Sequence, residues 1–435
     1  MLLRKITIGF ILLLSIWAFP CAQSAHAQRY KTSRPAITEK VAKSLYWKVS
    51  SALRDPGALA ANQDAIDDYF KKHLFPTMTD ISPDGLGQLA KRRDDLFRRV
   101  LRGATSKPAQ DHITNLTLDI MRKIVLDRYH PAVRYNAVLI LGELDQQYAT
   151  KDTPKPTPLP SGTKTLLILL ENEELKGVKV PSMLKVGALV GLERHARFGI
   201  DPQYTAQVTT AAIGLIQQQE TPTEMDPAVH HWLKCLAGRV LVQQFATGPN
   251  ADVNGALISM IEDQEMSLED RCCVSALLKK MDYSAAQGLD TTSAVTALGN
   301  LTQAVTHDEA DQARDFKEEL LSGNQGAFRG GTFRGARGGQ ELGPPYEKRR
   351  LLDRLLALKD GIEAVTEGAN PEGKSRLEAL VPPLQPVIDT ASEKDTTGIN
   401  IADPVIEMAS EIDRVLRNWK QSDQPSEENS DDEFS

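Results

Sequence analysis

Cysteine and aromatic residues are scarce in this sequence, and each shortage excludes a class of protein. The 435 residues include four cysteines, and aromatic residues make up 6% of the chain. Cys21 lies near the N-terminal apolar stretch, which leaves Cys235, Cys272 and Cys273. Three cysteines, an odd number, cannot form the disulfide framework of a small secreted domain. The low aromatic content disfavours a stacking surface for bases or sugars.

Motifs of common catalytic sites are also missing. The chain contains no Walker loop, no His-Glu-x-x-His, no Gly-x-Ser-x-Gly and no Cys-x-x-Cys. Residues 85–90, GLGQLA, match a dinucleotide fingerprint, but they follow Ser-Pro-Asp rather than a strand, and no βαβ pattern surrounds them. The sequence therefore predicts a protein that is not an enzyme and that binds no cofactor.

The first residues have the pattern of a secretory signal peptide. Arg4 and Lys5 precede the apolar run 6–19, and Ala25-His26-Ala27 offers a small-x-small cleavage site. The run is shorter than the roughly 20 residues of a membrane helix, which favours removal of residues 1–27 over retention as an anchor. We therefore expect an exported protein, periplasmic or extracellular, with no membrane span after cleavage.

Acidic residues outnumber basic residues along the chain. Asp and Glu number 58 against 51 Lys and Arg, a formal net charge of −7, and loss of Arg4 and Lys5 would change it to −9. A protein of this charge is not expected to bind nucleic acid or anionic membranes in a general way. We therefore expect a protein partner and no nucleic acid.

One short pattern occurs twice. Residues 130–142 read HPAVRYNAVLILG and residues 226–238 read DPAVHHWLKCLAG. Each copy starts with a polar residue followed by Pro, which is favourable in the first turn of a helix, and apolar residues follow at helical spacing. Both copies therefore predict amphipathic helices.

Two weaker copies, at 180–195 and 268–281, extend the pattern, and other helical runs alternate with the four copies. The copies start 50, 46 and 42 residues apart, which is the unit size of HEAT and armadillo repeats. The pattern resembles the second helix of a HEAT repeat over about 106–283, although His130 and His230 replace the Asp and Arg of that family. The resemblance implies an all-α fold, an irregular α-solenoid of HEAT-like helix pairs. An irregular helical bundle is the alternative.

The remaining segments complete the expected domain organisation. We expect an N-terminal helical cap at 28–105, HEAT-like repeats at 106–321, and a helical C-terminal extension at 346–420. Residues 322–345 are rich in Gly and Arg and predict a flexible linker, and residues 421–435 predict an acidic disordered tail.

Two groups of residues are candidate binding sites. His231 and Cys235 lie four residues apart on one predicted helix face next to His230, a spacing that suits a soft metal or haem. Cys272 or Cys273 would supply further ligands, or could pair with Cys235, although buried free thiols are an alternative. Arg134 and Lys185 are candidate protein-binding residues, because we expect them on the exposed surface of the second helices.

These observations favour one function and leave two alternatives. The favoured hypothesis is an exported, non-enzymatic helical-repeat scaffold that binds a protein partner through its solenoid surface. The first alternative is a metal- or haem-binding protein that uses the His231/Cys235 helix face. The second is binding of an acidic polymer through the Arg-Gly linker, in which Arg329, Arg334 and Arg337 alternate with Phe328 and Phe333.

Overall fold

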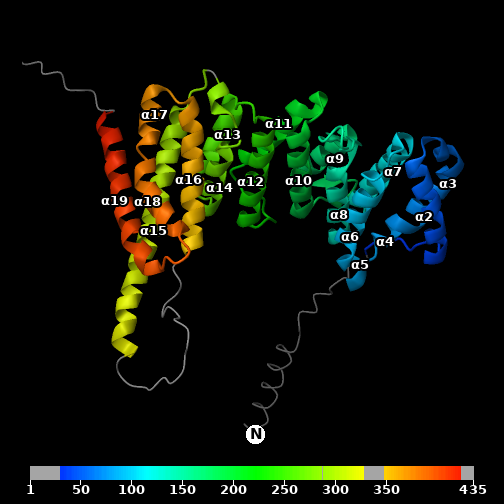
Figure 1. Cartoon of the computed structure of the whole chain (residues 1–435), viewed down its shortest axis with the longest axis horizontal. Coiled ribbons are helices and arrows are strands. Elements are labelled where there is room, and N and C mark those ends of the chain that lie inside the picture. Colours follow the sequence, from blue (N-terminus) through cyan, green and yellow to red (C-terminus); the bar gives the residue numbers. More distant parts are fainter. Residues whose placement is uncertain (1–29, 287, 328–346, 423–435) are drawn as a thin grey trace, which may run out of the picture.

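The computed structural model describes residues 30–286, 288–327 and 347–422, and this part of the chain is predominantly helical (Figure 1). The expectation of an all-α protein is confirmed. The expected signal peptide at 1–27, most of the expected linker at 322–345 and nearly all of the expected tail at 421–435 lie outside the described residues. Within the described residues, no helix is long and apolar enough to cross a membrane.

The N-terminal unit forms one end of a row of helices in Figure 1. Its helix α2 begins after Thr38, whose side chain accepts a hydrogen bond from the backbone N–H of Val41. Two π-helical turns, η2 and η3, interrupt the helices that follow. The elements are α2 (Glu39–Arg54), η1 (Pro56–Ala58), α3 (Leu59–Tyr69), η2 (Phe70–Leu74), α4 (Phe75–Thr77), α5 (Pro83–Gly87), α6 (Leu89–Asp95) and η3 (Leu96–Leu101).

Four helix pairs follow, and the second helix of each pair begins within one of the four copies of the sequence pattern. Caps fix the starts as expected: His130 accepts a hydrogen bond from the N–H of Ala132, and Asp226 accepts one from Ala228. The pairs are α7 (Lys107–Val125) with α8 (Pro131–Glu143), α9 (Pro160–Glu171) with α10 (Ser182–Phe198), α11 (Pro202–Ile216) with α12 (Pro227–Gln244), and α13 (Ala251–Glu262) with α14 (Leu268–Leu278).

Packing between the pairs is regular. The first helices contact one another in the order α7, α9, α11 and α13, and the second helices in the order α8, α10, α12 and α14. Short antiparallel strand pairs lie within the first two units of this row: β1 (Asp145–Gln147) with β2 (Thr157–Pro158), and β3 (Glu174–Leu175) with β4 (Val178–Lys179). Each helix pair therefore contacts its neighbours in the chain.

The C-terminal helices continue the row. Helix α15 (Thr292–Ala327) packs on α13, and α16 (Lys348–Gly368) packs on α14. Thus α15 extends the series of first helices, and α16 extends the series of second helices. Helix α15 includes residues 322–327, which we had assigned to the linker. The sequence did not reveal α15 as one long helix, nor the helices η4 (Tyr283–Ala285), α17 (Pro371–Glu378) and α18 (Val381–Ser392). The last helix, α19 (Gly398–Ser422), lies along α15 at the far end of the row (Figure 1).

Glycine allows the closest approach between two second helices. A Cβ atom on Gly142 would lie 2.7 Å from the Cα atom of Gly191, so α8 and α10 meet backbone to backbone. His195 strengthens this contact, because its Nε2 donates to the carbonyl of Gly142 at 3.1 Å and its Nδ1 lies 2.8 Å from the hydroxyl of Thr163. Burial, followed by the nearby Arg194, lowers the pKa of His195 to about 3, which keeps the ring neutral in this contact.

Gly142 and Gly238 occupy the same position in the two clear copies, yet we expect substitution by alanine to change the free energy of unfolding by different amounts. Gly142→Ala should lower the free energy of unfolding by about 1–3 kcal/mol, because its Cβ would collide with the backbone of Gly191. Gly238→Ala should stay within about 1 kcal/mol of the wild type, because its nearest neighbour is the flexible Leu257 side chain at 3.2 Å. Urea denaturation followed by circular dichroism measures both values. Equal losses in the two variants would contradict the glycine contact.

Candidate binding site

Arg134 and Lys185 are buried, so the expectation that both lie on the exposed surface is wrong. Arg134 donates from Nε to the carbonyl of Val125 at 2.9 Å and from Nη2 to the carbonyl of Lys179 at 3.0 Å. The Lys185 ammonium pairs with the carboxylate of Glu173. Both side chains are therefore occupied within the protein and are poorly placed to contact a partner.

The other two helix pairs place a buried basic residue at a corresponding position. Arg271 donates from Nε to the carbonyl of Ile261 at 2.7 Å, and His230 Nδ1 lies 3.2 Å from the hydroxyl of Thr221. In every pair, a basic side chain near the start of the second helix reaches polar atoms at or after the end of the first helix. Carbonyl groups at a helix C-terminus lack partners within the helix and carry partial negative charge. Arg134 and Arg271 compensate such carbonyl groups directly, whereas Lys185 and His230 contact side chains that follow the helix.

The proposed metal ligands have different surroundings. His230 is buried, His231 lines a groove together with Lys234 and Asp263, and the Sγ atom of Cys235 lies 3.9 Å from Asp270 Oδ1. Burial raises the pKa of Cys235, so the group is a neutral thiol rather than the thiolate that binds metal. Among the described residues, no group of three or more His, Cys, Asp or Glu side chains is placed to hold a metal ion.

All three described cysteines are free thiols. Cys272 is buried and Cys273 is exposed, so these neighbours lie on different sides of α14. Burial raises the pKa of Cys272 to about 12 and also raises the pKa of Cys273. None of the three is thus poised as a nucleophile.

The N-terminal unit contains a groove that the sequence did not predict. Its volume is about 490 Å³, and α2, α3, η2, α6 and η3 form its walls. The lining combines aromatic, basic and acidic side chains: Glu39, Ala42, Lys43, Tyr46, Trp47, Tyr69, His73, Leu74, Arg92, Asp95, Leu96, Arg99 and Val100. We call this feature the aromatic groove.

The aromatic side chains of this groove contact one another. The ring centroids of Tyr46 and Tyr69 lie 5.5 Å apart, and those of Tyr69 and His73 lie 5.9 Å apart. Trp47 stands beside them with 77% of its surface exposed, the largest fraction among the large hydrophobic residues that the structure describes. Exposure of this large apolar ring costs hydration free energy that a bound partner would recover.

Two π-helical turns shape the groove. His73 and Leu74 belong to η2, whereas Leu96, Arg99 and Val100 belong to η3. A π-helical turn is wider than an α-helical one and occurs frequently at functional sites. Here residues of both turns line the same groove. No short sequence motif marks either turn, which is why the sequence predicted only a helical cap for residues 28–105.

Burial favours the neutral form of two polar side chains in the groove, His73 and Tyr69. The Nδ1 atom of His73 is buried and has no hydrogen-bond partner, and burial lowers the pKa of this side chain. Burial, followed by Tyr46 and Asp95, raises the pKa of Tyr69 to about 12, so its hydroxyl stays protonated. Arg99 pairs with Asp95 at 2.8 Å, an exposed contact within the helix that is weak enough to be exchanged for another anion.

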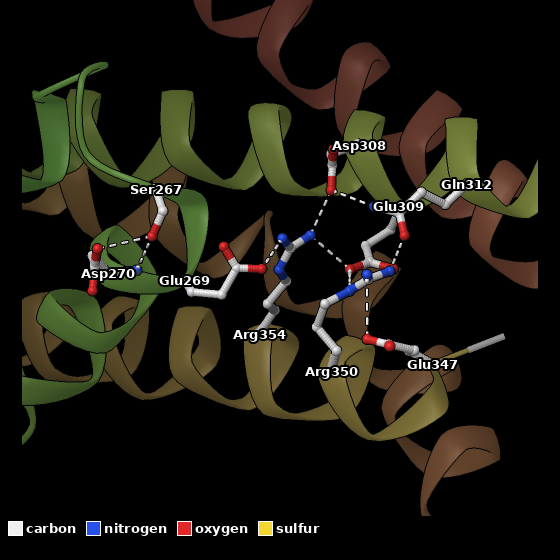
Figure 2. Close-up of polar contacts among 9 residues, drawn as sticks. All are labelled: Ser267, Glu269, Asp270, Asp308, Glu309, Gln312, Glu347, Arg350 and Arg354. Atoms are coloured by element: carbon white, nitrogen blue, oxygen red, sulfur yellow. Dashed lines mark hydrogen bonds and ion pairs between the residues drawn. The ribbon is translucent and has the colours of Figure 1, made fainter. Parts of the chain in front are cut away.

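A charged cluster at the other end of the row has a structural role. Figure 2 shows Arg354 of α16 between Glu269 of α14 and two acidic residues of α15, Asp308 and Glu309. Arg354 Nη1 lies 2.6 Å from Asp308 and 2.7 Å from Glu309, and the side chain of Glu309 is fully buried. Burial opposes the charge of Arg354, but the hydrogen bonds that it donates to Asp308 and Glu269 outweigh burial and raise its pKa. This cluster fixes α16 against α14 and α15.

No protein-family model matches the chain, and neither a curated protein nor a solved structure matches it significantly. A function for this chain has to be inferred from the chemistry of its own surface. The aromatic groove is the strongest basis for that inference, because the buried basic residues and the charged cluster are occupied by contacts within the protein.

The buried position of Arg134 predicts a large effect on stability. Arg134→Met should lower the free energy of unfolding by about 2–4 kcal/mol, because the buried carbonyl of Val125 and the partly buried carbonyl of Lys179 lose their donor. Lys185→Met should cost less than about 1 kcal/mol, because its partner Glu173 is mostly exposed and stays hydrated. Urea denaturation measures both values. The interpretation fails if Arg134→Met unfolds at the wild-type denaturant concentration.

The charged cluster generates a second stability prediction. Arg354→Met should destabilise the fold by about 3–5 kcal/mol, because the buried carboxylate of Glu309 loses a main counter-ion. Arg349→Met is the matched control on the same helix: this side chain is 95% exposed, so its loss should change stability by less than about 0.5 kcal/mol. Thermal denaturation distinguishes the two, and equal melting temperatures would contradict the role of the cluster.

Proposed function

We propose that the chain is an exported, non-enzymatic helical-repeat scaffold of the HEAT-like type that binds a protein partner through the aromatic groove. The proposed architecture is an irregular α-solenoid, whose stacked helix pairs hold the N-terminal unit in place. The exposed Trp47 beside Tyr46 and Tyr69 is the observation that carries the proposed binding function.

The packing of the helices supports the solenoid. Each first helix contacts the neighbouring first helices, and each second helix contacts the neighbouring second helices, from α7 to α16. Contact between successive units is the defining property of repeat proteins. The basic residues that recur at the start of the second helices, Arg134, Lys185, His230 and Arg271, add a shared internal contact to each pair.

The composition of the aromatic groove supports a protein partner. Trp, Tyr and Arg are the residues that most often dominate the binding energy of protein interfaces, and all three line this groove. Tyr46 and Tyr69 are partly buried and held by ring contacts, so ordering them on binding would cost little conformational entropy. Trp47 would supply most of the newly buried apolar surface.

Export is supported by the sequence of residues 1–27. The basic start, the short apolar run and the small-x-small site form a signal peptide pattern, and the free thiols of the described chain place no demand on an oxidising compartment. The two alternatives, a metal or haem site at His231 and Cys235 and polymer binding through 322–345, gain no specific support from the described contacts.

Loss of the Trp47 ring should abolish partner capture. The test is chemical cross-linking in an extract of the compartment to which the protein is exported. Trp47→Ser should lower recovery of a discrete partner by at least about tenfold, because truncation of an aromatic hot spot costs about 2 kcal/mol or more of binding free energy. Trp232→Ser is the matched control, since Trp232 is 50% exposed on α12 and does not line the aromatic groove. Quantitative mass spectrometry of the cross-linked products provides the measurement.

Two results would contradict the proposal. If the wild-type protein and Trp47→Ser recover the same cross-linked proteins in equal amounts, the aromatic groove is not the partner-binding site. A stoichiometric metal in protein purified without a histidine tag, lost in His231→Ala, would favour the metal-binding alternative instead. Circular dichroism of each variant controls for loss of folding.

A further inference from the structure

The charges of the chain are divided unevenly between its two ends. Residues 30–105, which contain the aromatic groove, carry 14 Lys and Arg against 9 Asp and Glu. Residues 106–435 carry 34 Lys and Arg against 49 Asp and Glu. The whole protein therefore has a net negative charge, whereas its N-terminal unit has a net positive charge, which would attract an acidic ligand.

Basic residues line the aromatic groove from three of its elements. Arg92 and Arg99 line it from α6 and η3, and Lys43 lines it from α2. Arg98, next to Arg99, is 65% exposed and pairs with Asp94 of its own helix at 3.2 Å. Such exposed pairs contribute little to stability, so a carboxylate of a ligand can replace the one within the helix. The groove thus combines cationic side chains with an aromatic surface.

One segment of this chain has the complementary composition. Residues 423–435, DQPSEENSDDEFS, contain six carboxylate side chains, no basic residue and a single aromatic residue, Phe434. A ring of this kind can pack against Trp47 and Tyr46 while neighbouring carboxylates pair with Arg92 and Arg99. The segment follows Ser422 in the sequence, and α19, which ends at Ser422, lies at the end of the row opposite to the aromatic groove (Figure 1).

The same copy of the chain cannot make this contact. Contacts lead from α19 to α2 through α15, α13, α11, α9 and α7, and Figure 1 shows these helices as an extended row with α19 and α2 near its opposite ends. Packed helices lie about 8–10 Å apart, so six steps along this row give roughly 48–60 Å. The 12 residues from 423 to Phe434 span at most about 40–43 Å when fully extended. The segment can reach an aromatic groove only on another molecule.

We propose that the aromatic groove binds an acidic peptide with an aromatic residue, and that residues 423–435 of a second copy are its occupant. This inference rests on the proposed binding function of the groove and specifies the partner. In a pair of copies joined in this way, the groove of one copy and the acidic segment of the other stay unoccupied. Further copies can therefore add head to tail.

Fluorescence anisotropy of a labelled peptide with the sequence of residues 423–435 tests the proposal on the full-length chain. The wild type should bind this peptide, and a peptide with Ser in place of Phe434 should bind at least about tenfold more weakly. Trp47→Ser in the protein should cause a similar loss, whereas Trp232→Ser should bind as the wild type does. A peptide with Asn and Gln in place of its acidic residues should bind weakly, and higher salt should weaken the acidic peptide.

Controls separate this inference from competing ones. The Arg-Gly segment is another basic region, so a variant with Ser at Arg329, Arg334 and Arg337 should bind the peptide unchanged; loss of binding there would overturn the assignment to the groove. Sedimentation velocity should show concentration-dependent association of the wild type that decreases in Phe434→Ser and in Trp47→Ser. Equal association in all three proteins would overturn the head-to-tail contact.

The outcome also distinguishes the two proposals. If the peptide does not bind but Trp47→Ser still abolishes capture of another protein, the occupant is wrong and the proposed function stands. If Trp47→Ser changes neither peptide binding nor capture, both proposals are wrong. Circular dichroism and thermal denaturation confirm that each variant is folded.

Discussion

The rest of the row depends on a buried basic side chain that joins the two helices of each pair. Arg134 and Arg271 donate hydrogen bonds to carbonyl groups at the end of the preceding helix, and Lys185 and His230 reach polar side chains in the corresponding place. A helix that ends inside a protein leaves unpaired carbonyl groups, which are costly to bury. Arg134 and Arg271 satisfy carbonyl groups of this kind, whereas Lys185 and His230 contact side chains beyond the helix end, so a buried basic residue joins the two helices of each pair.

At each end of the row, the last helices contact neighbouring helices on one side only, and the two ends differ in how that open side is covered. At the C-terminal end, α15 and α19 pack along each other, and the cluster around Arg354 holds α16 against α14 and α15. At the N-terminal end, short helices and two π-helical turns leave the aromatic groove open. The end that packs less completely is the end that presents Trp47, and this is why we place partner binding there.

The sequence predicted the helices well and the surroundings of their side chains less well. The starts of α8 and α12 followed from a polar cap and a first-turn proline, which act within a few residues. The exposure of Arg134 and Lys185 was predicted wrongly, because a charged residue in the first turn of a helix is usually hydrated, and only the end of the neighbouring helix changes this. The aromatic groove was missed, because its walls come from segments that are far apart between Glu39 and Val100.

The sequence by itself determined the all-α class, the position of the main helix pairs and the acidic balance, since these depend on local spacing and on composition. The tertiary structure alone decided which glycine meets a backbone, which basic residue is buried, and where an aromatic surface remains exposed. Gly142 and Gly238 hold the same position in two copies of one pattern, yet Gly142 contacts Gly191 and Gly238 contacts a leucine side chain. The difference arises from packing between helix pairs, which the sequence of one pair alone does not determine.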